Sequence, residues 1–210
     1  MKHIVKQPEP PDFVAWKAQA NADWQPSYAL LSGAPKRALK QALMQEQGYL
    51  CCYCEQSLTD ADSHIEHFNP QHLHAGDDIA YKNLLCSCLN ERKKGNPIHC
   101  GALKDDWFDL GLLISPLDPT CESRFQYLDN GKIQPAQSSD LAAQTTIAKL
   151  GLDIAKLNEM RNKALEPFLD ETLTQEALQT FVSEYLKQDA EGRWSPFWTT
   201  VQALYGAWVV

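Results

Sequence analysis

Six of the seven cysteines in this chain fall between positions 51 and 100, and this clustering constrains the fold more than any other feature. The composition is otherwise that of an ordinary globular protein, with 44% hydrophobic and 22% charged residues over 210 positions. A chain that is kept reduced rarely uses such a cluster for disulfides, so metal ligation is the better interpretation. The sequence therefore predicts a metal-stapled segment within one generous domain, or within a small domain wrapped by further elements.

Cys51 and Cys54 form a C-x-x-C pair, whose spacing lets two thiolates face one tetrahedral ion from a tight turn. Cys88 and Cys100 are the best second pair, although Cys86 competes with Cys88 because only one of them need point inward. A closed four-thiolate site has no open position, so we expect a structural zinc ion there. The alternative is a set of buried free thiols. Two cysteines are expected to stay off the ion, namely Cys52 and Cys121.

Periodicity and turn residues divide the chain into three parts. We expect an N-terminal helical segment at 1–48, a cysteine-rich core at 49–110, and a hairpin followed by helices at 111–210, packed as one unit with the core. Within the core, residues 63–68 alternate enough to predict a strand, whereas residues 81–88 are compatible with a helix start or a turn. Asn130-Gly131 predicts a hairpin. The expected fold class is α+β.

The sequence His64-Ile65-Glu66-His67 is the sharpest candidate for chemistry. In a strand, side chains alternate, so Glu66 and His64 share one face while His67 lies on the other. In a bent strand, Glu66 can still bind a divalent cation while His67 takes a proton from water, because histidine titrates near neutral pH. Oxygen ligands with a histidine favour Mg²⁺ or Mn²⁺. This motif is weak alone, and its position between the two halves of the cysteine site strengthens it.

The net charge of −8 has the wrong sign for a protein that coats nucleic acid over a broad surface. Basic residues are nevertheless concentrated between positions 81 and 104, where one acidic residue accompanies five basic ones. Arg92, Lys93 and Lys94 are therefore candidate substrate contacts, and a solvated loop is the alternative. No run of about 18 apolar residues and no apolar leader is present, so we expect a cytoplasmic protein without a membrane span.

Taken together, the motifs resemble a known family. The series Cys51-x-x-Cys54, Glu66-His67-x-x-Pro70, Asn83-Leu84 and Cys100 with Lys104 four positions later resembles the HNH, or ββα-metal, nucleases. The stretches GYLCCYCEQ, SHIEHFNPQ, YKNLLCSC and HCGALKDDW further resemble the HNH proteins of the Septu and retron antiphage systems, the PtuB-like group. This resemblance spans nearly the whole chain, and its specificity comes from the order and spacing of the motifs.

The resemblance implies a role for each matching residue. His67 is then the general base, and Glu66, which stands where most HNH proteins have Asp, is a ligand of the catalytic cation. Asn83 braces the hairpin that carries the base, and Lys104 is a phosphate contact. The structural zinc ligands are Cys51, Cys54, Cys88 and Cys100. The implied fold is a small ββα-metal core wrapped by N-terminal and C-terminal helices.

One position departs from the family pattern. Common HNH proteins place a third His or Asn directly after the last cysteine, and here that position is Gly101, which has no side chain to ligate a metal. His99 is the first substitute for this ligand, although neighbouring residues on a helix point about 100° apart. His64, on the same strand face as Glu66, is the second candidate.

The expected function is therefore a metal-dependent HNH endonuclease that cuts nucleic acid, with DNA the first candidate, as the effector of an antiphage system. The resemblance implies an ABC-type ATPase partner, and the chain has no G-x-x-x-x-G-K-[ST] loop for binding ATP by that route. The aromatic C-terminus either docks that partner or packs on the core. The alternatives are a zinc-stapled binding module without catalysis and an RNA-cleaving HNH enzyme.

Overall fold

The computed structural model describes residues 1–71, 77–90, 94–170 and 172–209. Within these ranges the fold is α+β, as expected, with seven α-helices and two small antiparallel sheets. The helices are α1 (Pro11–Lys17), α2 (Gly33–Glu46), α3 (Gly101–Lys104), α4 (Leu141–Leu150), α5 (Ala155–Leu165), α6 (Gln175–Tyr185) and α7 (Trp198–Tyr205). The strands are β1 (Ser63–His67), β2 (Leu84–Cys88), β3 (Phe125–Tyr127) and β4 (Ile133–Pro135). None of these helices has the length and apolarity needed to cross a membrane.

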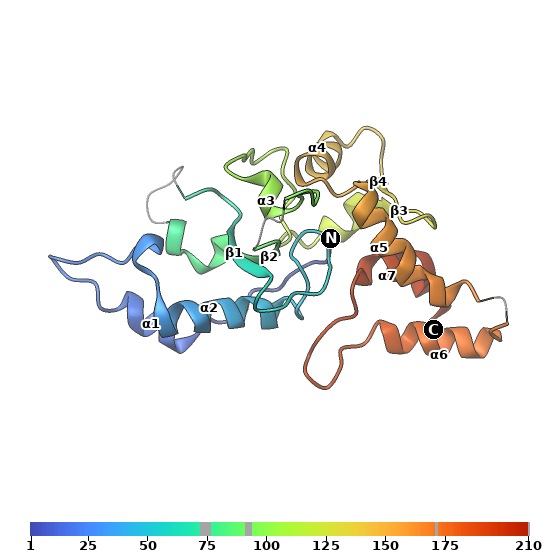
Figure 1. The fold of residues 1–210 in the computed structure, drawn as a ribbon, viewed down its shortest axis with the longest axis horizontal. Helices are drawn as coiled ribbons and strands as arrows, with labels where there is room; N and C mark the ends of the chain where they lie inside the picture. The colour runs from blue at the N-terminus through green and yellow to red at the C-terminus, as the bar shows by residue number, and fades with distance from the viewer. Residues whose placement is uncertain (72–76, 91–93, 171, 210) are drawn as a thin grey trace.

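The molecule is elongated in the view of Figure 1, with α1 and α2 at one end and α5, α6 and α7 at the other. The hairpin β1–β2 and the short helix α3 lie between these ends. One main core joins the parts of the chain, with buried residues such as Phe13, Leu85 and Leu152. The central hairpin is therefore supported by chain segments on both sides of it in the sequence.

The first sheet pairs β1 with β2 in antiparallel register, from Ser63 opposite Cys88 to His67 opposite Leu84. The strand β1 agrees with the sequence-based expectation. Residues 81–88, which were compatible with a helix start or a turn, instead form a 3-10 turn at Tyr81–Asn83 and then β2. Every residue of β2 is buried, so this strand lacks the apolar–polar alternation by which a half-exposed strand is recognised.

The second sheet is the hairpin β3–β4, which the Asn130-Gly131 turn predicted. Gly131 in this turn has a φ of 78°, and its carbonyl accepts a hydrogen bond of 3.1 Å from Arg161 Nη1. The buried Arg161 also donates to the carbonyl of Leu152 at 2.8 Å. This one guanidinium therefore ties the hairpin turn to the chain between α4 and α5.

The C-terminal segment forms a smaller apolar cluster around Leu165, Phe168, Val182 and Val201. Most of the aromatic side chains there pack within the molecule, with Phe197 buried and Tyr205 stacked on Phe168 at a centroid distance of 5.1 Å. Trp194 meets Trp198 edge-on, with centroids 5.5 Å apart. Trp208, in contrast, is 44% exposed. Of these aromatics, all but Trp208 thus pack at least partly within the molecule, and docking of a partner stays a prediction.

A buried carboxylate fastens this segment to the cysteine turn. Glu55 directly follows Cys54, is 2% exposed, and accepts hydrogen bonds from both the backbone amide and the hydroxyl of Thr199 in α7. The backbone carbonyl of Glu55 also accepts a hydrogen bond from the amide of Phe197 at 2.9 Å. The start of α7 is thus held against the turn that carries two of the clustered cysteines.

The hairpin turn provides a test of this packing. A Cβ atom at Gly131 would lie 2.1 Å from the backbone oxygen of Asn158, whereas a Cβ at Gly192, with a similar φ of 75°, meets nothing within 4 Å. We expect Gly192→Ala to lower the free energy of unfolding by about 1–2 kcal/mol through backbone strain alone. Gly131→Ala should cost a further ~1–3 kcal/mol, because the backbone must also move. Urea unfolding measures both, and equal losses would contradict the close contact.

Candidate active site

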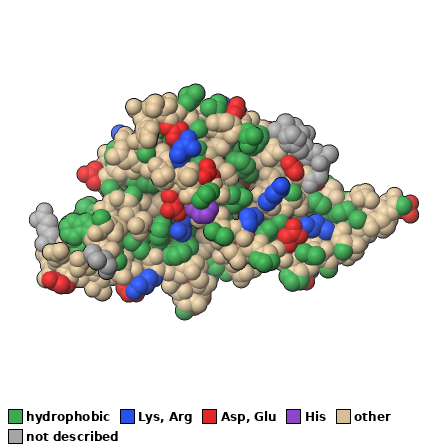
Figure 2. Space-filling view, turned by 180° about the vertical axis from the view of Figure 1, so that it is seen from behind, with side chains coloured by type: hydrophobic (Ala, Val, Ile, Leu, Met, Phe, Trp, Pro, Cys, Tyr) green, Lys and Arg blue, Asp and Glu red, His purple; other side chains and the backbone are tan. Residues whose placement is uncertain are grey.

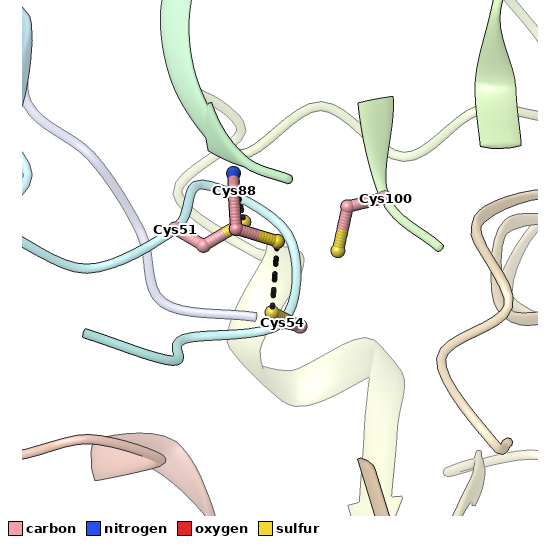
Figure 3. Close-up of side chains that lie close together, drawn as sticks. All are labelled: Cys51, Cys54, Cys88 and Cys100. Carbon is pink, nitrogen blue, oxygen red and sulfur yellow. Dashed lines mark hydrogen bonds between the residues drawn. The ribbon is translucent and has the colours of Figure 1, made fainter. Parts of the chain in front are cut away.

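Four cysteine side chains drawn from three separated segments converge on one point, as Figure 3 shows. Cys51 and Cys54 lie in the turn between α2 and β1, Cys88 ends β2, and Cys100 directly precedes α3. All four are buried, and their sulfur atoms lie within 4.8 Å of one another. Cys86, the competing residue of β2, is buried outside this group. The structure therefore brings together the two expected pairs.

The geometry of this cluster fits a tetrahedral ion. Zinc–sulfur bonds of about 2.3 Å place neighbouring sulfurs about 3.8 Å apart, and Cys54 Sγ lies 3.9 Å from Cys88 Sγ. The backbone amide of Cys88 also donates to Cys51 Sγ at 3.5 Å, which favours a thiolate there. Burial, together with the neighbouring sulfurs, raises the pKa of Cys100 well above its ordinary value. Several thiolates can share this space only when a cation neutralises them, so the cluster could hold a metal such as zinc.

Backbone strain surrounds the cluster. Glu55 after Cys54, Leu89 after Cys88, and Cys100 itself have φ angles of 65°, 64° and 57°. None is glycine, and each such conformation costs about 1–2 kcal/mol for an L-residue. The chain therefore makes a left-handed turn at or beside three of the four cysteines, and the cluster must supply the energy that keeps these turns in place.

His99 lies with the cysteines. It is buried, and its Nδ1 is 3.1 Å from Cys100 Sγ and 3.8 Å from Cys88 Sγ. It is absent from the described residues that line the cavity next to Glu66. The structure therefore does not bring His99 to the carboxylate that it was expected to join. The reason is local, because His99 precedes the left-handed turn at Cys100 while Gly101 follows it and faces Glu66.

The carboxylate of Glu66 is anchored through one oxygen. Oε1 accepts a hydrogen bond of 3.1 Å from the hydroxyl of Tyr53 and lies 3.1 Å from Lys104 Nζ. Oε2 lies 3.4 Å from Nε2 of His64, which shares the strand face with Glu66 as the alternation predicted. With Glu66 only 6% exposed, these contacts fix its orientation. Oε2 is left on the side where Gly101 and His64 lie.

A cavity of about 480 Å³ opens at this point, and Glu66, His64 and Gly101 all line it. A Cβ atom at Gly101 would lie 2.2 Å from Glu66 Oε2, closer than real Cβ atoms approach, and 3.0 Å from His64 Nε2, a tight contact. The glycine thus leaves room for a carboxylate oxygen and an imidazole nitrogen side by side. Oxygen and imidazole donors of this kind suit a divalent cation such as Mn²⁺ or Mg²⁺.

His67 lines the same cavity, with both ring nitrogens engaged. Nε2 lies 2.9 Å from the backbone oxygen of Asp78, and because a carbonyl only accepts, Nε2 carries the proton. Nδ1 then bears the lone pair, toward which the amide of Gln71 donates at 3.3 Å. Burial lowers the pKa of His67 below its ordinary value, which favours the neutral ring. The ring of Tyr28 packs edge-on against it, with centroids 4.4 Å apart.

Asn83 holds the segment between the two strands. Its side-chain oxygen accepts from the amide of Asn69 at 2.8 Å, and its side-chain nitrogen donates to the carbonyls of Asn69 and Asp77 at 2.9 and 3.0 Å. Its backbone oxygen accepts from the amide of Phe68, directly after β1. These four hydrogen bonds tie Asn83 to Phe68, Asn69 and Asp77, next to the end of the strand that carries His67.

Lys104 differs from the expected phosphate contact in its surroundings. It is 2% exposed, and its ammonium donates to the carbonyls of His67 and Asp105 at 3.0 and 3.2 Å besides pairing with Glu66. These three partners use all three ammonium hydrogens, so a phosphate would have to displace one of them. Of the other expected substrate contacts, Lys94 is exposed, while Arg92 and Lys93 lie outside the described residues.

One face of the molecule carries mixed charge. On the face shown in Figure 2, acidic and basic side chains are interspersed, and a histidine lies near the centre with both kinds beside it. Interspersed charge of this kind gives no broad positive field for a nucleic-acid backbone on that face.

The site therefore combines a cluster suited to a metal with a carboxylate and a histidine that share one cavity. The sequence matches two proteins named as candidate HNH endonucleases of retrons. The chain is therefore similar in sequence to proteins named as HNH endonucleases.

Both relatives are bacterial. The retron Vc95 protein of Vibrio cholerae serotype O1 biovar El Tor is 31% identical, over 62% of this chain and 65% of that protein. The chain thus spans slightly less than two thirds of the length of the retron Vc95 protein. The retron Ec83 protein of Escherichia coli is 28% identical, over 80% of each chain. No protein-family model matches the sequence.

Two features of the site had no usable signal in the sequence. Tyr53 sits between Cys51 and Cys54, where an aromatic residue is equally compatible with simple packing, and its bond to Glu66 spans 13 residues. The burial of Lys104 was equally hidden, because lysine is among the residue types that are least often buried.

The cluster can be tested with two cysteines of one strand. Cys88→Ala removes a sulfur from the four-cysteine group, and Cys86→Ala removes an equally buried sulfur outside it. We expect Cys88→Ala to abolish tight zinc binding and unfold the cysteine-rich segment, because metal binding free energy is folding free energy in such sites. Cys86→Ala should keep its zinc. Elemental analysis and thermal unfolding of the purified proteins measure both, and equal zinc contents would contradict the assignment.

The Tyr53 hydroxyl generates a second test. Tyr53→Phe deletes a hydrogen bond to a buried carboxylate while keeping the ring that packs in the core. We expect the free energy of unfolding to fall by about 1–3 kcal/mol with zinc content unchanged. Tyr49→Phe is the matched control, since the Tyr49 hydroxyl meets Gln41 in an exposed hydrogen bond of 3.0 Å. Urea unfolding should show little effect of that control.

Proposed function

We propose that this chain is a metal-dependent endonuclease that hydrolyses phosphodiester bonds, with DNA as its substrate. The observation that carries this proposal is the hydrogen bond from His67 Nε2 to the backbone oxygen of Asp78, which leaves a lone pair on Nδ1 in the cavity that Glu66 shares. A neutral imidazole whose far nitrogen is held by a carbonyl is oriented as a general base. The similarity to two proteins named as HNH endonucleases supports the same chemistry.

Each residue has a distinct task in this mechanism. His67 Nδ1 accepts the proton of the attacking water, which takes the place of the Gln71 amide beside that nitrogen. Glu66 is the ligand of a divalent cation, and that cation, when bound, neutralises charge on the phosphate and on the leaving oxygen. Tyr53 and Lys104 hold Glu66 through Oε1, so the carboxylate is in position before substrate arrives.

The cysteine cluster is proposed to be structural. Its four sulfurs saturate a tetrahedral zinc ion, so no position remains for water or substrate. Its role is to set β2 and α3 in place around β1. The order β1, β2, α3 with a metal-facing carboxylate on β1 is the ββα-metal arrangement that we propose for the core.

We further propose that the chain acts as the nuclease of a retron-type antiphage system, together with an ABC-type ATPase. The names of the two relatives support the retron setting. The net charge of −8 supports dependence on a partner, because phosphate contacts dominate non-specific DNA binding and an acidic chain supplies few of them.

Removal of the base tests the proposed activity. His67→Ala should lower the rate of plasmid nicking about 10²- to 10⁴-fold, the usual contribution of a positioned general base. Zinc content and unfolding should stay as in the wild type, and added imidazole should restore part of the rate. His3→Ala, at a histidine outside the cavity lining, is the control.

The assay uses the full chain with Mg²⁺ or Mn²⁺, with and without the ATPase, on supercoiled DNA and on single-stranded RNA. Cleavage of RNA alone would replace the proposed substrate. Wild-type nicking by His67→Ala would remove the proposed base. Binding of nucleic acid without cleavage by the wild type, under every combination, would favour a zinc-stapled binding module instead.

A further inference from the structure

The cavity beside Glu66 receives no side chain from the first residue of α3, and an imidazole from β1 occupies that side instead. We propose that His64, through Nε2, is the second protein ligand of the divalent cation that Glu66 binds, and that Gly101 is required to leave room for this pair. This inference rests on the proposed function, since it concerns the same cation site.

The spacing of the two donor atoms supports a shared ion. Two ligands at right angles on an ion about 2.1 Å away lie about 3 Å apart, and His64 Nε2 lies 3.4 Å from Glu66 Oε2. A charge-assisted hydrogen bond between them would be about 2.7–2.9 Å long. The observed separation is thus too long for a strong direct bond and suits two ligands facing one ion.

The strand places both donors without rearrangement. His64 and Glu66 are two positions apart on β1, so their side chains leave the same face of the sheet. Glu66 is already held through Oε1, so it is Oε2 that remains beside His64. A ligand pair at positions i and i+2 of one strand needs no contribution from a helix.

Gly101 supplies the space that this pair needs. A Cβ atom there would lie 2.2 Å from Glu66 Oε2, so this oxygen would have to move while Oε1 is held by Tyr53 and Lys104. A glutamate at position 66 therefore needs a glycine at position 101.

The other imidazoles near the site are committed elsewhere. Among the described residues that line the cavity, the histidines are His64 and His67. His67 Nε2 is used by the carbonyl of Asp78, and its Nδ1 is the proposed base. His99 contacts the sulfur of Cys100. His64 is the ring that remains beside Oε2 of Glu66.

The first experiment measures Mn²⁺ binding to the zinc-loaded full chain by electron paramagnetic resonance, without any cleavage assay. His64→Phe keeps a ring of similar size without the nitrogen. Loss of residues that merely support a ligand costs about 10- to 100-fold in metal affinity, so loss of the ligand should weaken Mn²⁺ binding at least about tenfold. At saturating Mn²⁺, the spin-echo modulation from an imidazole nitrogen should also disappear. His3→Ala should change neither signal.

The second variant tests the space rather than the ligand. Gly101→Ala leaves His64 intact but places a Cβ against Glu66 Oε2, so it too should weaken Mn²⁺ binding with zinc content unchanged. Gly111→Ala is the matched control, because its Cβ would lie 3.5 Å from the Asp109 carboxylate, which is an ordinary contact. Circular dichroism and zinc analysis confirm that each variant is folded.

The outcomes separate the two proposals. If His64→Phe binds Mn²⁺ as the wild type does and keeps the nitrogen modulation, while Glu66→Gln loses binding, the His64 assignment is wrong and the nuclease proposal stands. If Glu66→Gln also binds Mn²⁺ normally, the cation site itself is elsewhere, and both proposals fail. Weakened binding in His64→Phe with the nitrogen modulation retained would make His64 a positioning residue and overturn its role as a ligand.

Discussion

The convergence of four cysteines is the constraint on which the rest of the structure depends. The turn after α2, the end of β2 and the residue before α3 meet at these sulfurs, and three left-handed, non-glycine positions lie at or beside them. At about 1–2 kcal/mol each, that strain totals only a few kcal/mol, whereas structural zinc sites contribute about 10–16 kcal/mol in small metal-dependent domains. A bound zinc ion would therefore offset this backbone strain several times over. It would also stabilise short elements such as β2 and α3, neither of which is long enough to be stable alone.

The same cluster reaches the candidate active site through two short chains of contacts. Tyr53, between Cys51 and Cys54, donates its hydroxyl to Glu66. The hydroxyl oxygen of Ser87 lies 3.7 Å from Cys51 Sγ. The same oxygen accepts a hydrogen bond of 3.2 Å from the backbone amide of Gly101. The cysteine cluster and the cation site proposed at Glu66 therefore share no side chain, but these contacts connect their positions. A disturbance of the cysteine turn should shift both the carboxylate and the start of α3 that faces it.

The sequence predicted those features of the fold and the site that depend on interactions between residues close together in the chain. Strand β1 and the hairpin at Gly131 have local signals, namely alternation and turn chemistry, and both were predicted. Strand β2 is buried on both faces, so its apolar run carried no period with which to separate strand from helix. The position of His99 depended on a left-handed turn at Cys100, a conformation that no local propensity of cysteine suggests. The pairing of Lys104 with Glu66 links positions 38 residues apart and becomes visible only when the sheet and α3 are assembled.

Under the proposed function, Lys104 also explains how a buried carboxylate can be held in place before a cation binds. A buried charge without a partner is strongly disfavoured, and Glu66 is only 6% exposed. The ammonium of Lys104 lies 3.1 Å from Oε1 and is itself fixed by two backbone carbonyls, so it neutralises Glu66 without covering Oε2. A lysine in that position keeps the site assembled when no metal is bound, and it holds the carboxylate from the side opposite to His64 and Gly101. Oε2, which lies beside His64 rather than Tyr53 or Lys104, is the oxygen through which the proposed cation would bind.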